Sequence, residues 1–293
     1  MPSWLQHKIR RHPRIRECLL PWWLGYLDLR WRLICASRRP VLYRAGNVTV
    51  RLHPEGQIAE QLWKGNFESL ERNFVEAYLK PGMRVVNVGA NVGLYVVMAS
   101  TLVGHEGEVH AFEPSATTYA RLIRNLELNR CRNVSANRAA LSSASGKLFL
   151  RADPMHPSYD GHRFVERIEA VDHPLDSDEL VEALTLDDYF GSLRPRELST
   201  VELMIVDVEG AELAVLQGAR AILAQKELTL LLECTKHQDA VESFLAELGY
   251  RFWSWNDERR RLEPARFREQ AKRHDVIVRR SAWEAPRQWQ AQS

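Results

Sequence analysis

The sequence predicts an α/β protein built on a doubly wound, mostly parallel sheet. From Val85 onward, short apolar runs alternate with amphipathic segments, and the runs are rich in branched residues, as strands buried on both faces are. The composition agrees, because 45% of the 293 residues are hydrophobic and 27% are charged, which suits a soluble protein with a substantial core. Such alternation is typical of parallel strands joined by helices.

The expected strands and helices follow one another through the middle of the chain. Five apolar runs are expected as strands, at 85–88, 109–112, 134–137, 203–206 and 228–232. Four segments are expected as helices, at 93–102, 115–129, 212–224 and 236–248. In the second of these, Tyr119, Leu122 and Leu126 fall at i, i+3 and i+7 and form one apolar face.

Shorter elements are expected on both sides of this region. Residues 41–44 and 48–52 flank a glycine-containing turn and are expected to form a β-hairpin. A helix at 67–79 should end before a Pro-Gly pair, which is a stop signal. Near the C-terminus, 250–253 and 275–279 are expected as a final, antiparallel pair of strands.

Three segments make up the expected domain organisation. They are an N-terminal extension at 1–44, a main domain at 45–280 and a loosely packed tail at 281–293. Within the main domain, 153–184 is polar and lacks a clear period. We expect it to be an insertion with one strand, placed where loops of such folds meet substrate.

The N-terminal extension concentrates positive charge and aromatic residues. Residues 1–44 hold ten basic and two acidic residues, a net charge of +8, whereas the whole chain has a net charge of +2. Its apolar stretch is about half of the ~20 residues that a membrane-spanning helix needs. Charged residues interrupt the segment, which argues against a signal peptide. Three interpretations stay open: a helical extension packed on the domain, peripheral association with an anionic membrane surface, or a patch for an anionic substrate or nucleic acid.

The cysteines indicate a reducing compartment. Cys18, Cys35, Cys131 and Cys234 are scattered, and the sequence has no CxxC pair. This spacing suits neither a disulfide framework nor a zinc site. We therefore expect free thiols in a cytoplasmic protein, and no metal.

A glycine turn and an acidic residue stand at the ends of the first two predicted parallel strands. The strand at 85–88 runs into Gly89-Ala90-Asn91-Val92-Gly93 and then a helix, and glycine lets the backbone approach a ligand closely. Glu113 follows the second strand, 20 residues after Gly93, where a carboxylate can accept both hydroxyls of a ribose. The turn lacks the GxGxxG of dinucleotide-binding proteins. An adenosine-type cofactor other than NAD is therefore expected.

Five segments of the chain together resemble one known family. They are VVNVGANVGLY, VHAFEPSATTYARLIRNLELN, LTLDDYF, VDVEGAELAVLQGA and LLLEC. In this order and spacing, over roughly residues 65–249, they are similar to the FkbM-type S-adenosylmethionine-dependent methyltransferases. The resemblance implies a Rossmann-like seven-stranded methyltransferase fold with S-adenosyl-L-methionine as cofactor. It also implies methyl transfer, most often to a hydroxyl of a sugar or secondary metabolite.

The resemblance implies residues for the cofactor site. Gly89, Asn91 and Gly93 would line the methionine and sugar side of the cofactor, and Glu113 would bind its ribose. The segment that ends at Leu141 would border the adenine.

It implies catalytic and acceptor residues as well. Asp207 ends the fourth strand, where that fold places residues that face the reacting methyl group and the cofactor, and Glu209 and Glu212 stand beside it. For these two glutamates a structural role is the alternative, because carboxylates are favoured near helix N-termini. His237, after the fifth strand, is a second candidate base, with a surface histidine as the alternative.

Two positions depart from the family pattern. Asn87 stands where the family has an aspartate that faces the ammonium end of the cofactor. Ile205 stands where the family has a lysine two residues before Asp207. Asn87 is still expected to bind the cofactor, but the loss of both charges puts activity in doubt.

Other candidates carry weaker signals. Tyr159 and His162 in the insertion are expected to contact the acceptor, and their spacing is no metal motif. Asp187 and Asp188 are expected to form a helix N-cap.

The sequence leaves three functional hypotheses. The first is a cytoplasmic O-methyltransferase acting on a small-molecule or glycan acceptor. The second is a non-catalytic relative that binds the cofactor or a partner. The third is a nucleic-acid methyltransferase with the +8 extension as a phosphate-binding arm, which is not favoured because the other 249 residues carry a net charge of −6.

Overall fold

The computed structural model describes residues 13–54, 57–64, 67–152, 163–167, 177–192, 200–225, 228–234, 236–270, 275–283 and 285. Two compact units divide the chain. The first holds Met1–Tyr43 and Arg51–Phe67, and the second holds Arg44–Val50 and Glu68–Ser293.

Two helices and a hairpin lie in the N-terminal part of the chain. Helix α2 covers Pro13–Ser37 and helix α3 covers Gln57–Lys64. Strands β1 (Val41–Ala45) and β2 (Val48–Leu52) pair as a two-stranded sheet, which confirms the predicted hairpin. In the part of the chain that the structure describes, no helix has both the length and the apolar character needed to span a bilayer.

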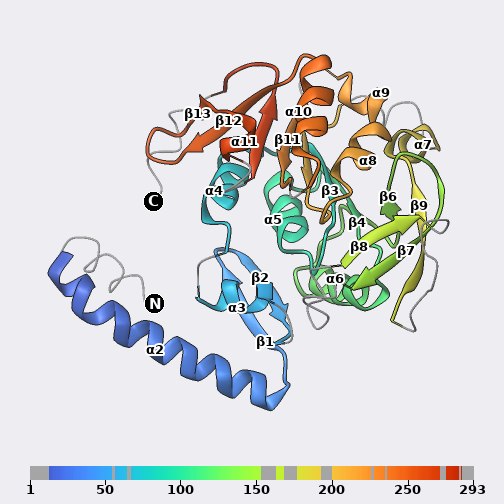
Figure 1. Cartoon of the computed structure of the whole chain (residues 1–293). Helices are drawn as coiled ribbons and strands as arrows, with labels where there is room; N and C mark the ends of the chain where they lie inside the picture. Colours follow the sequence, from blue (N-terminus) through green and yellow to red (C-terminus); the bar gives the residue numbers. More distant parts are fainter. Residues whose placement is uncertain are drawn as a thin grey trace. The chain divides into compact units, whose positions relative to one another are not determined.

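The central sheet of the second unit has eight strands among the described residues. They are β3 (Arg84–Val88), β4 (Glu108–Phe112), β5 (Val134–Asn137), β10 (Leu203–Val206), β11 (Thr229–Leu232), β12 (Arg251–Asn256), β13 (Arg261–Pro264) and β14 (Val276–Arg279). Their order in the sheet is β13-β12-β14-β11-β10-β3-β4-β5. Figure 1 shows β13, β12, β11, β3 and β4 following one another across the molecule in this sense. The five strands from β11 to β5 are parallel, and β14, β12 and β13 are antiparallel. The doubly wound, mostly parallel Rossmann-like sheet is confirmed, and β13 adds an eighth strand to the seven expected.

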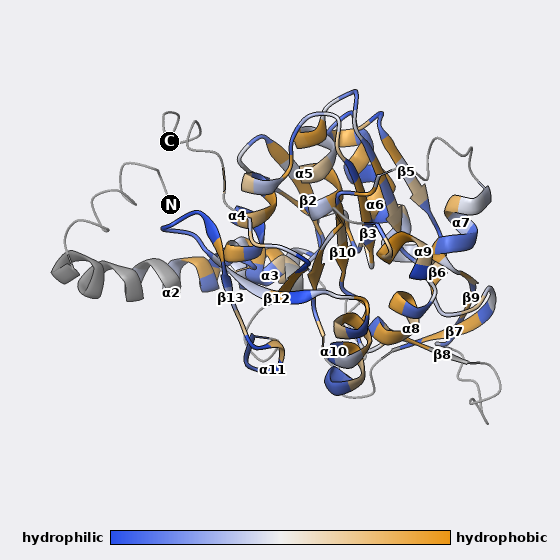
Figure 2. Ribbon diagram, turned by 90° about the horizontal axis from the view of Figure 1, so that it is seen from above, coloured by the Kyte–Doolittle hydropathy of each residue, from blue (hydrophilic) through white to orange (hydrophobic). Residues whose placement is uncertain are grey.

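Helices cover both faces of this sheet. They are α4 (Ser69–Tyr78), α5 (Leu94–Val103), α6 (Ala116–Leu128), α7 (Leu186–Ser192), α8 (Glu212–Gln217), α9 (Arg220–Leu223), α10 (Gln238–Glu247) and α11 (Phe267–Gln270). Figure 2 shows α4, α5 and α6 on one side of the apolar strands and α8, α9 and α10 on the other. Alternate residues of the strands serve the two sides, so that Val86, Val88 and Met204 pack in the core cluster of α8, α9 and α10.

A second, smaller sheet includes strands from the insertion at 153–184, where one strand was expected. Its strands are β6 (Ala140–Leu141), β7 (Gly146–Ala152), β8 (Arg163–Arg167) and β9 (Glu179–Leu184), in the order β6-β9-β7-β8. The prediction of one strand was therefore wrong, because the insertion contributes two strands that pair with β7 just before it. Leu148, Leu150 and Val181 form a small apolar core of their own. Short alternating strands of this kind become stable only when paired, so the sequence signal in each one is weak.

The helix expected at 212–224 is divided into α8 and α9. At Gly218 a Cβ atom would lie 2.0 Å from the carbonyl oxygen of Ser142, so the chain needs glycine there. Asp187 then accepts hydrogen bonds from the backbone N–H groups of Ala221 and Ile222, at 2.9 and 3.2 Å, and caps the start of α9.

The order of the strands determines where ligands bind. From β3 the chain builds the sheet outward through β4 to β5, and from β10 it builds in the opposite direction to β11. The switch point therefore lies between β3 and β10, and ligands of such folds bind outside the carboxyl ends of the strands there.

Candidate functional site

The turn after β3 brings three strand ends together. Gly89 has φ 78°, and the N–H groups of Gly89 and Ala90 both donate to the carbonyl oxygen of Phe112, at 3.0 and 2.9 Å. A Cβ atom on Gly89 would lie only 1.8 Å from the carbonyl oxygen of Asp207. The end of β3 is therefore packed directly against the end of β10, and only glycine fits between them.

Glu113 lies at the end of β4 with its carboxylate against this turn. One carboxylate oxygen accepts the N–H of Asn91 at 2.9 Å and the other accepts the N–H of Ser115 at 3.0 Å. Burial raises the pKa of Glu113 to about 7, although both backbone hydrogen bonds lower it. Each oxygen keeps a lone pair for a further donor, so the carboxylate can accept the two hydroxyls of a ribose. The geometry at this strand end fits the adenosyl group that the sequence predicts.

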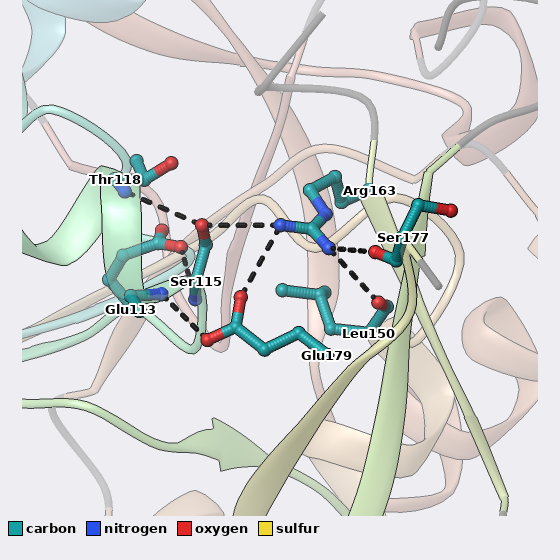
Figure 3. Close-up of polar contacts among 8 residues, drawn as sticks. Glu113, Ser115, Thr118, Leu150, Arg163, Ser177 and Glu179 are labelled. Atoms are coloured by element: carbon teal, nitrogen blue, oxygen red, sulfur yellow. Dashed lines mark hydrogen bonds and ion pairs between the residues drawn. The ribbon is translucent and has the colours of Figure 1, made fainter. Parts of the chain in front are cut away.

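The small sheet holds the start of α6 and the loop that carries Glu113. Figure 3 shows Arg163 of β8 between Ser115 and Glu179. Its guanidinium donates to the hydroxyl of Ser115 at 3.5 Å, to Glu179 at 3.4 Å, and to the carbonyl oxygens of Leu150 and Ser177, both at 3.2 Å. Glu179 in turn accepts the N–H of Ala116, the first residue of α6, at 2.9 Å.

Ser115 connects Arg163 to Glu113. Its hydroxyl accepts the N–H of Thr118 at 3.4 Å as the N-cap of α6, and its own N–H donates to Glu113. The positive charge of Arg163 lowers the pKa of Glu113 and so opposes the effect of burial. The insertion therefore supports Glu113 and the start of α6 by hydrogen bonds and by charge.

Several carboxyl groups gather at the carboxyl ends of β10 and β11. We call them the acidic group, and it consists of Glu68, Asp207, Glu233 and Asp275. Burial raises the pKa of Asp207 well above its ordinary value, and the negative charge of Glu233 and a hydrogen bond to it raise it further. Burial raises the pKa of Glu68 to about 7, while the hydroxyl of Tyr95 donates to its carboxylate at 2.6 Å and lowers it. Such a group of carboxylates attracts positive charge. Shifted pKa values of this kind are common at functional sites.

Four loops at this end of the sheet hold a non-glycine residue in left-handed backbone geometry. They are Glu68 (φ 38°), Asn91 (φ 48°), Glu209 (φ 48°) and His237 (φ 54°). This geometry is costly outside glycine and gathers at functional sites. The strained positions lie next to the glycine turn and to the acidic group.

The predicted acceptor residues have different surroundings. Glu212 is buried, and its carboxylate accepts the N–H of Gly210 at 2.9 Å. Glu209 is half-buried, and His237 is exposed as the residue that precedes α10. Contact of these residues with an acceptor stays a prediction, as does the catalytic role of His237.

Other predicted residues lie outside the reacting centre or outside the described residues. Leu141 of β6 is buried in the core cluster, and its place beside the adenine stays a prediction. Tyr159 and His162 lie outside the described residues. The proposed N-cap at Asp187 and Asp188 was wrong, because Thr185 accepts the N–H of Asp188 at 2.9 Å and caps α7 itself.

Sequence reasoning missed several residues of the site. They are Glu68, Tyr95, Arg163, Glu179, Glu233 and Asp275. Glu233 had a usable signal, because it directly follows a predicted strand of the parallel sheet, as Glu113 and Asp207 do. Glu68 and Asp275 stand before an element, Tyr95 is the second residue of α5, and the other two lie in the insertion. Strand order alone gives none of them a position.

Comparison with known proteins identifies the family. The profile of the FkbM methyltransferase domain matches residues 87–252, more than half of the chain. "Methyltransferase 1" of Beauveria bassiana is 29% identical over 145 residues, and "Methyltransferase sdnD" of Sordaria araneosa is 29% identical over 154 residues. Each match covers 46% of this chain and 57% or 59% of the relative, so the similarity spans little more than half of either curated protein.

Comparison with solved structures gives matches of low similarity. The FkbM methyltransferase of Methylobacillus flagellatus KT is 12% identical, with a TM-score of 0.41 over 86% of this chain and 58% of that one. From its matching domain, this chain belongs to the FkbM family of S-adenosylmethionine-dependent methyltransferases.

Proposed function

We propose that the chain transfers a methyl group from S-adenosylmethionine to a hydroxyl of a sugar, glycan or secondary metabolite, with Asp207 as the base. The cofactor supplies an electrophilic methyl carbon when it is bound. Glu113 and the Gly89 turn would hold its adenosyl part, and Asn87, Asn91, Gly93 and the Leu141 segment would complete its surroundings. The observation that carries the proposal is the position of Asp207, whose backbone touches the glycine turn.

The surroundings of Asp207 suit a base that removes a hydroxyl proton. A general base works best when its pKa approaches the operating pH, and burial together with Glu233 moves the pKa of Asp207 in that direction. Alignment of the acceptor oxygen supplies most of the remaining acceleration, and well-held pairs gain roughly 7 to 11 kcal/mol.

The proposed acceptor site lies on the loops after β10 and β11. Glu209 and His237 border it, and both have left-handed backbone geometry of the kind that gathers at functional sites. Tyr159 and His162 of the insertion are proposed as further acceptor contacts, with Glu212 as a support for the turn before α8.

We propose a cytoplasmic place of action, with peripheral association at an anionic membrane surface through residues 1–44. The described cysteines Cys35, Cys131 and Cys234 are free thiols, as in reducing compartments. The +8 charge of residues 1–44 supports the attraction to anionic lipids.

The test of the reaction uses the full chain with S-adenosylmethionine that carries a labelled methyl group. Sugars, glycans and secondary metabolites with free hydroxyls are supplied as acceptors, and Asp207→Asn is compared with wild type. We expect turnover to fall about 10²- to 10⁴-fold in the variant, because it loses its base, while cofactor affinity changes little.

Asp187→Asn is the matched control, because it removes a carboxylate that caps α9 at a distance from β10. It should retain turnover. Undiminished turnover in Asp207→Asn would contradict the assignment of the base. Cofactor binding without turnover on any acceptor would instead favour the non-catalytic alternative.

A further inference from the structure

Helix α2 has two faces, and the inner one is already occupied. Leu27 and Trp31 are buried, and the ring of Trp31 lies 6.2 Å from that of Trp63 in α3. Asp28 forms an ion pair of 2.7 Å with Lys64 of α3. These contacts fix the face of α2 that packs inside the first unit.

The outer face carries a continuous row of large apolar side chains. Trp22, Tyr26, Leu29 and Leu33 stand at i, i+4, i+7 and i+11, which places them on one side of a helix. Their exposed fractions are 81%, 47%, 59% and 63%. We call these four residues the outer stripe. Single exposed apolar residues are ordinary, but an aligned row of four marks an interaction surface.

Arginines border the outer stripe on both sides. At 100° per residue, Arg30 and Arg32 lie about 80° to either side of the line through the stripe, and both are exposed. The guanidinium of Arg30 lies 5.7 Å from the centre of the Tyr26 ring. Arg38 and Arg39 follow at the exposed C-terminal end of the helix. A lipid-facing helix has this arrangement, with cations at the level of the headgroups and rings and aliphatic groups below them.

We infer that the outer stripe binds an anionic lipid surface, with α2 lying in the plane of the interface. The charge of the segment selects this partner. A second copy of the chain would bring the bordering arginines of two helices together and oppose pairing through the stripe. An anionic bilayer offers both the negative charge for the arginines and an apolar layer for the stripe. The inference rests on the membrane association proposed above for residues 1–44, and it assigns that association to the outer stripe. It does not depend on methyl transfer, so it holds whether or not Asp207 is the base.

The experiment sediments the full chain with phosphatidylcholine vesicles, prepared with and without phosphatidylglycerol. We expect binding to the anionic vesicles at low salt, and at least about tenfold weaker binding at 1 M salt, where the screening length falls to about 3 Å. Hydrogen exchange of the α2 amides with and without vesicles gives a second measurement. The amides of 22–33 should be protected by anionic vesicles only.

Two kinds of variant separate the stripe from its border. Leu29→Glu with Leu33→Glu places charge in the apolar layer, and Arg32→Glu reverses one bordering charge. Each variant should lower the partition coefficient at least about tenfold. For Arg32→Glu the reason is that one basic residue near such a surface contributes ~1 kcal/mol, and a reversal of its charge counts twice. The controls are Leu180→Glu, at a leucine that is 50% exposed in β9, and Arg266→Glu, at an arginine that is 85% exposed before α11. Both controls should bind like wild type.

Three results would overturn the inference. One is equal binding to neutral and anionic vesicles, and another is binding that the stripe variant does not change. The third is concentration-dependent self-association that the stripe variant abolishes, with no binding to vesicles, because a second copy would then be the partner. If the stripe variant loses cofactor binding, hydrogen exchange of the wild-type chain decides alone. In that case, equal exchange of the α2 amides with and without anionic vesicles would contradict the inference.

Discussion

Asn87 of β3 and Ile205 of β10 are register partners in neighbouring parallel strands, so their side chains emerge on the same face of the sheet. Both are buried, at 3% and 2% exposure. They are also the two positions at which the resemblance to the family leads us to expect an acid and a lysine. The departures therefore concern one pair of neighbours. Loss of both members of a buried ion pair costs little, whereas loss of one leaves an unpaired charge. Asp207 and Glu113 are untouched by the change.

The first prediction concerns this pair. Asn87→Asp alone places a carboxylate beside an isoleucine, and we expect the free energy of unfolding to fall by about 3 kcal/mol or more. Asn87→Asp combined with Ile205→Lys should recover most of that loss, because the two charges are adjacent. Denaturant unfolding of the wild type, both single variants and the double variant measures the coupling. Additive effects of the two substitutions on the free energy of unfolding would contradict the idea that residues 87 and 205 act as a pair.

The second prediction concerns the pH dependence of cofactor binding. Burial raises the pKa of Glu113 to about 7, and the ionised carboxylate is the better acceptor for ribose hydroxyls. Protonation competes with the cofactor below that pH, so affinity should fall as the pH drops from 8 to 5, by up to tenfold per unit. Calorimetry across this range measures the slope. In Glu113→Gln the affinity should be weaker at pH 8 and nearly independent of pH, and a wild-type slope in this variant would contradict the assignment.

The same carboxyl group should affect the stability of the protein without cofactor. Its pKa lies above the ordinary value of 4.5 in the folded state, so folding favours the protonated form. The contribution is fully present below pH 4.5 and is lost as the pH rises through about 7. Unfolding of wild type and Glu113→Gln at pH 5 and pH 8 should show a smaller pH effect in the variant.

Part of the site was visible in the sequence because strand ends meet at one edge. Gly89, Glu113 and Asp207 each follow an apolar run, and parallel strands bring such residues together whatever the lengths of the connections. Glu68 and Asp275 could not be placed in this way, since each precedes an element and reaches Asp207 only through tertiary packing. The fold follows the same division. Gly218 is a local signal for the end of α8, but its close approach to Ser142 depends on tertiary packing and could not be predicted.

The third prediction uses Glu233 to test how Asp207 is tuned. Replacing Glu233 by Gln removes the neighbouring negative charge that raises the pKa of Asp207. Because the proposed base must be ionised to act, turnover should decline as the pH falls through the pKa of Asp207, and this decline should move to lower pH in the variant. A profile of turnover against pH for wild type and Glu233→Gln measures the shift. Glu247→Gln on the exposed part of α10 is the control and should leave the profile in place. An unshifted decline in Glu233→Gln would mean that another group limits the rate.

The fourth prediction concerns the support from the small sheet. Arg163→Ala removes the donor to Ser115 and Glu179 together with the positive charge that lowers the pKa of Glu113. We expect the pH below which cofactor affinity declines to move upward, and affinity at neutral pH to fall at least about threefold, a fraction of the 1.5 to 3 kcal/mol of one charged hydrogen bond. Arg163→Lys keeps the charge and should restore the pH dependence.

Arg151→Ala is the matched control for the loss of the Arg163 contacts. Arg151 forms an ion pair of 3.3 Å with Asp178 in the same small sheet, so its loss perturbs that sheet to a similar degree. Cofactor affinity should be unchanged in this variant. Equal losses in Arg151→Ala and Arg163→Ala would show that the sheet as a whole matters rather than the contact to α6.

The fifth prediction separates close approach from backbone conformation at the glycine turn. Gly89 and Gly82 have similar backbone geometry, with φ 78° and 86°, so an alanine at either position meets the same left-handed penalty of about 1 to 2 kcal/mol. At Gly82 the new methyl group would meet nothing within 4 Å, whereas at Gly89 it would lie 1.8 Å from the backbone oxygen of Asp207. Backbone cannot yield as a flexible side chain does, so Gly89→Ala must push the ends of β3 and β10 apart. We expect Gly82→Ala to bind cofactor normally, with a free energy of unfolding lowered only by that penalty. Gly89→Ala should lose cofactor binding as well. Calorimetry and denaturant unfolding of both variants decide the point, since equal cofactor affinity in the two would mean that the contact between Gly89 and Asp207 does not shape the site.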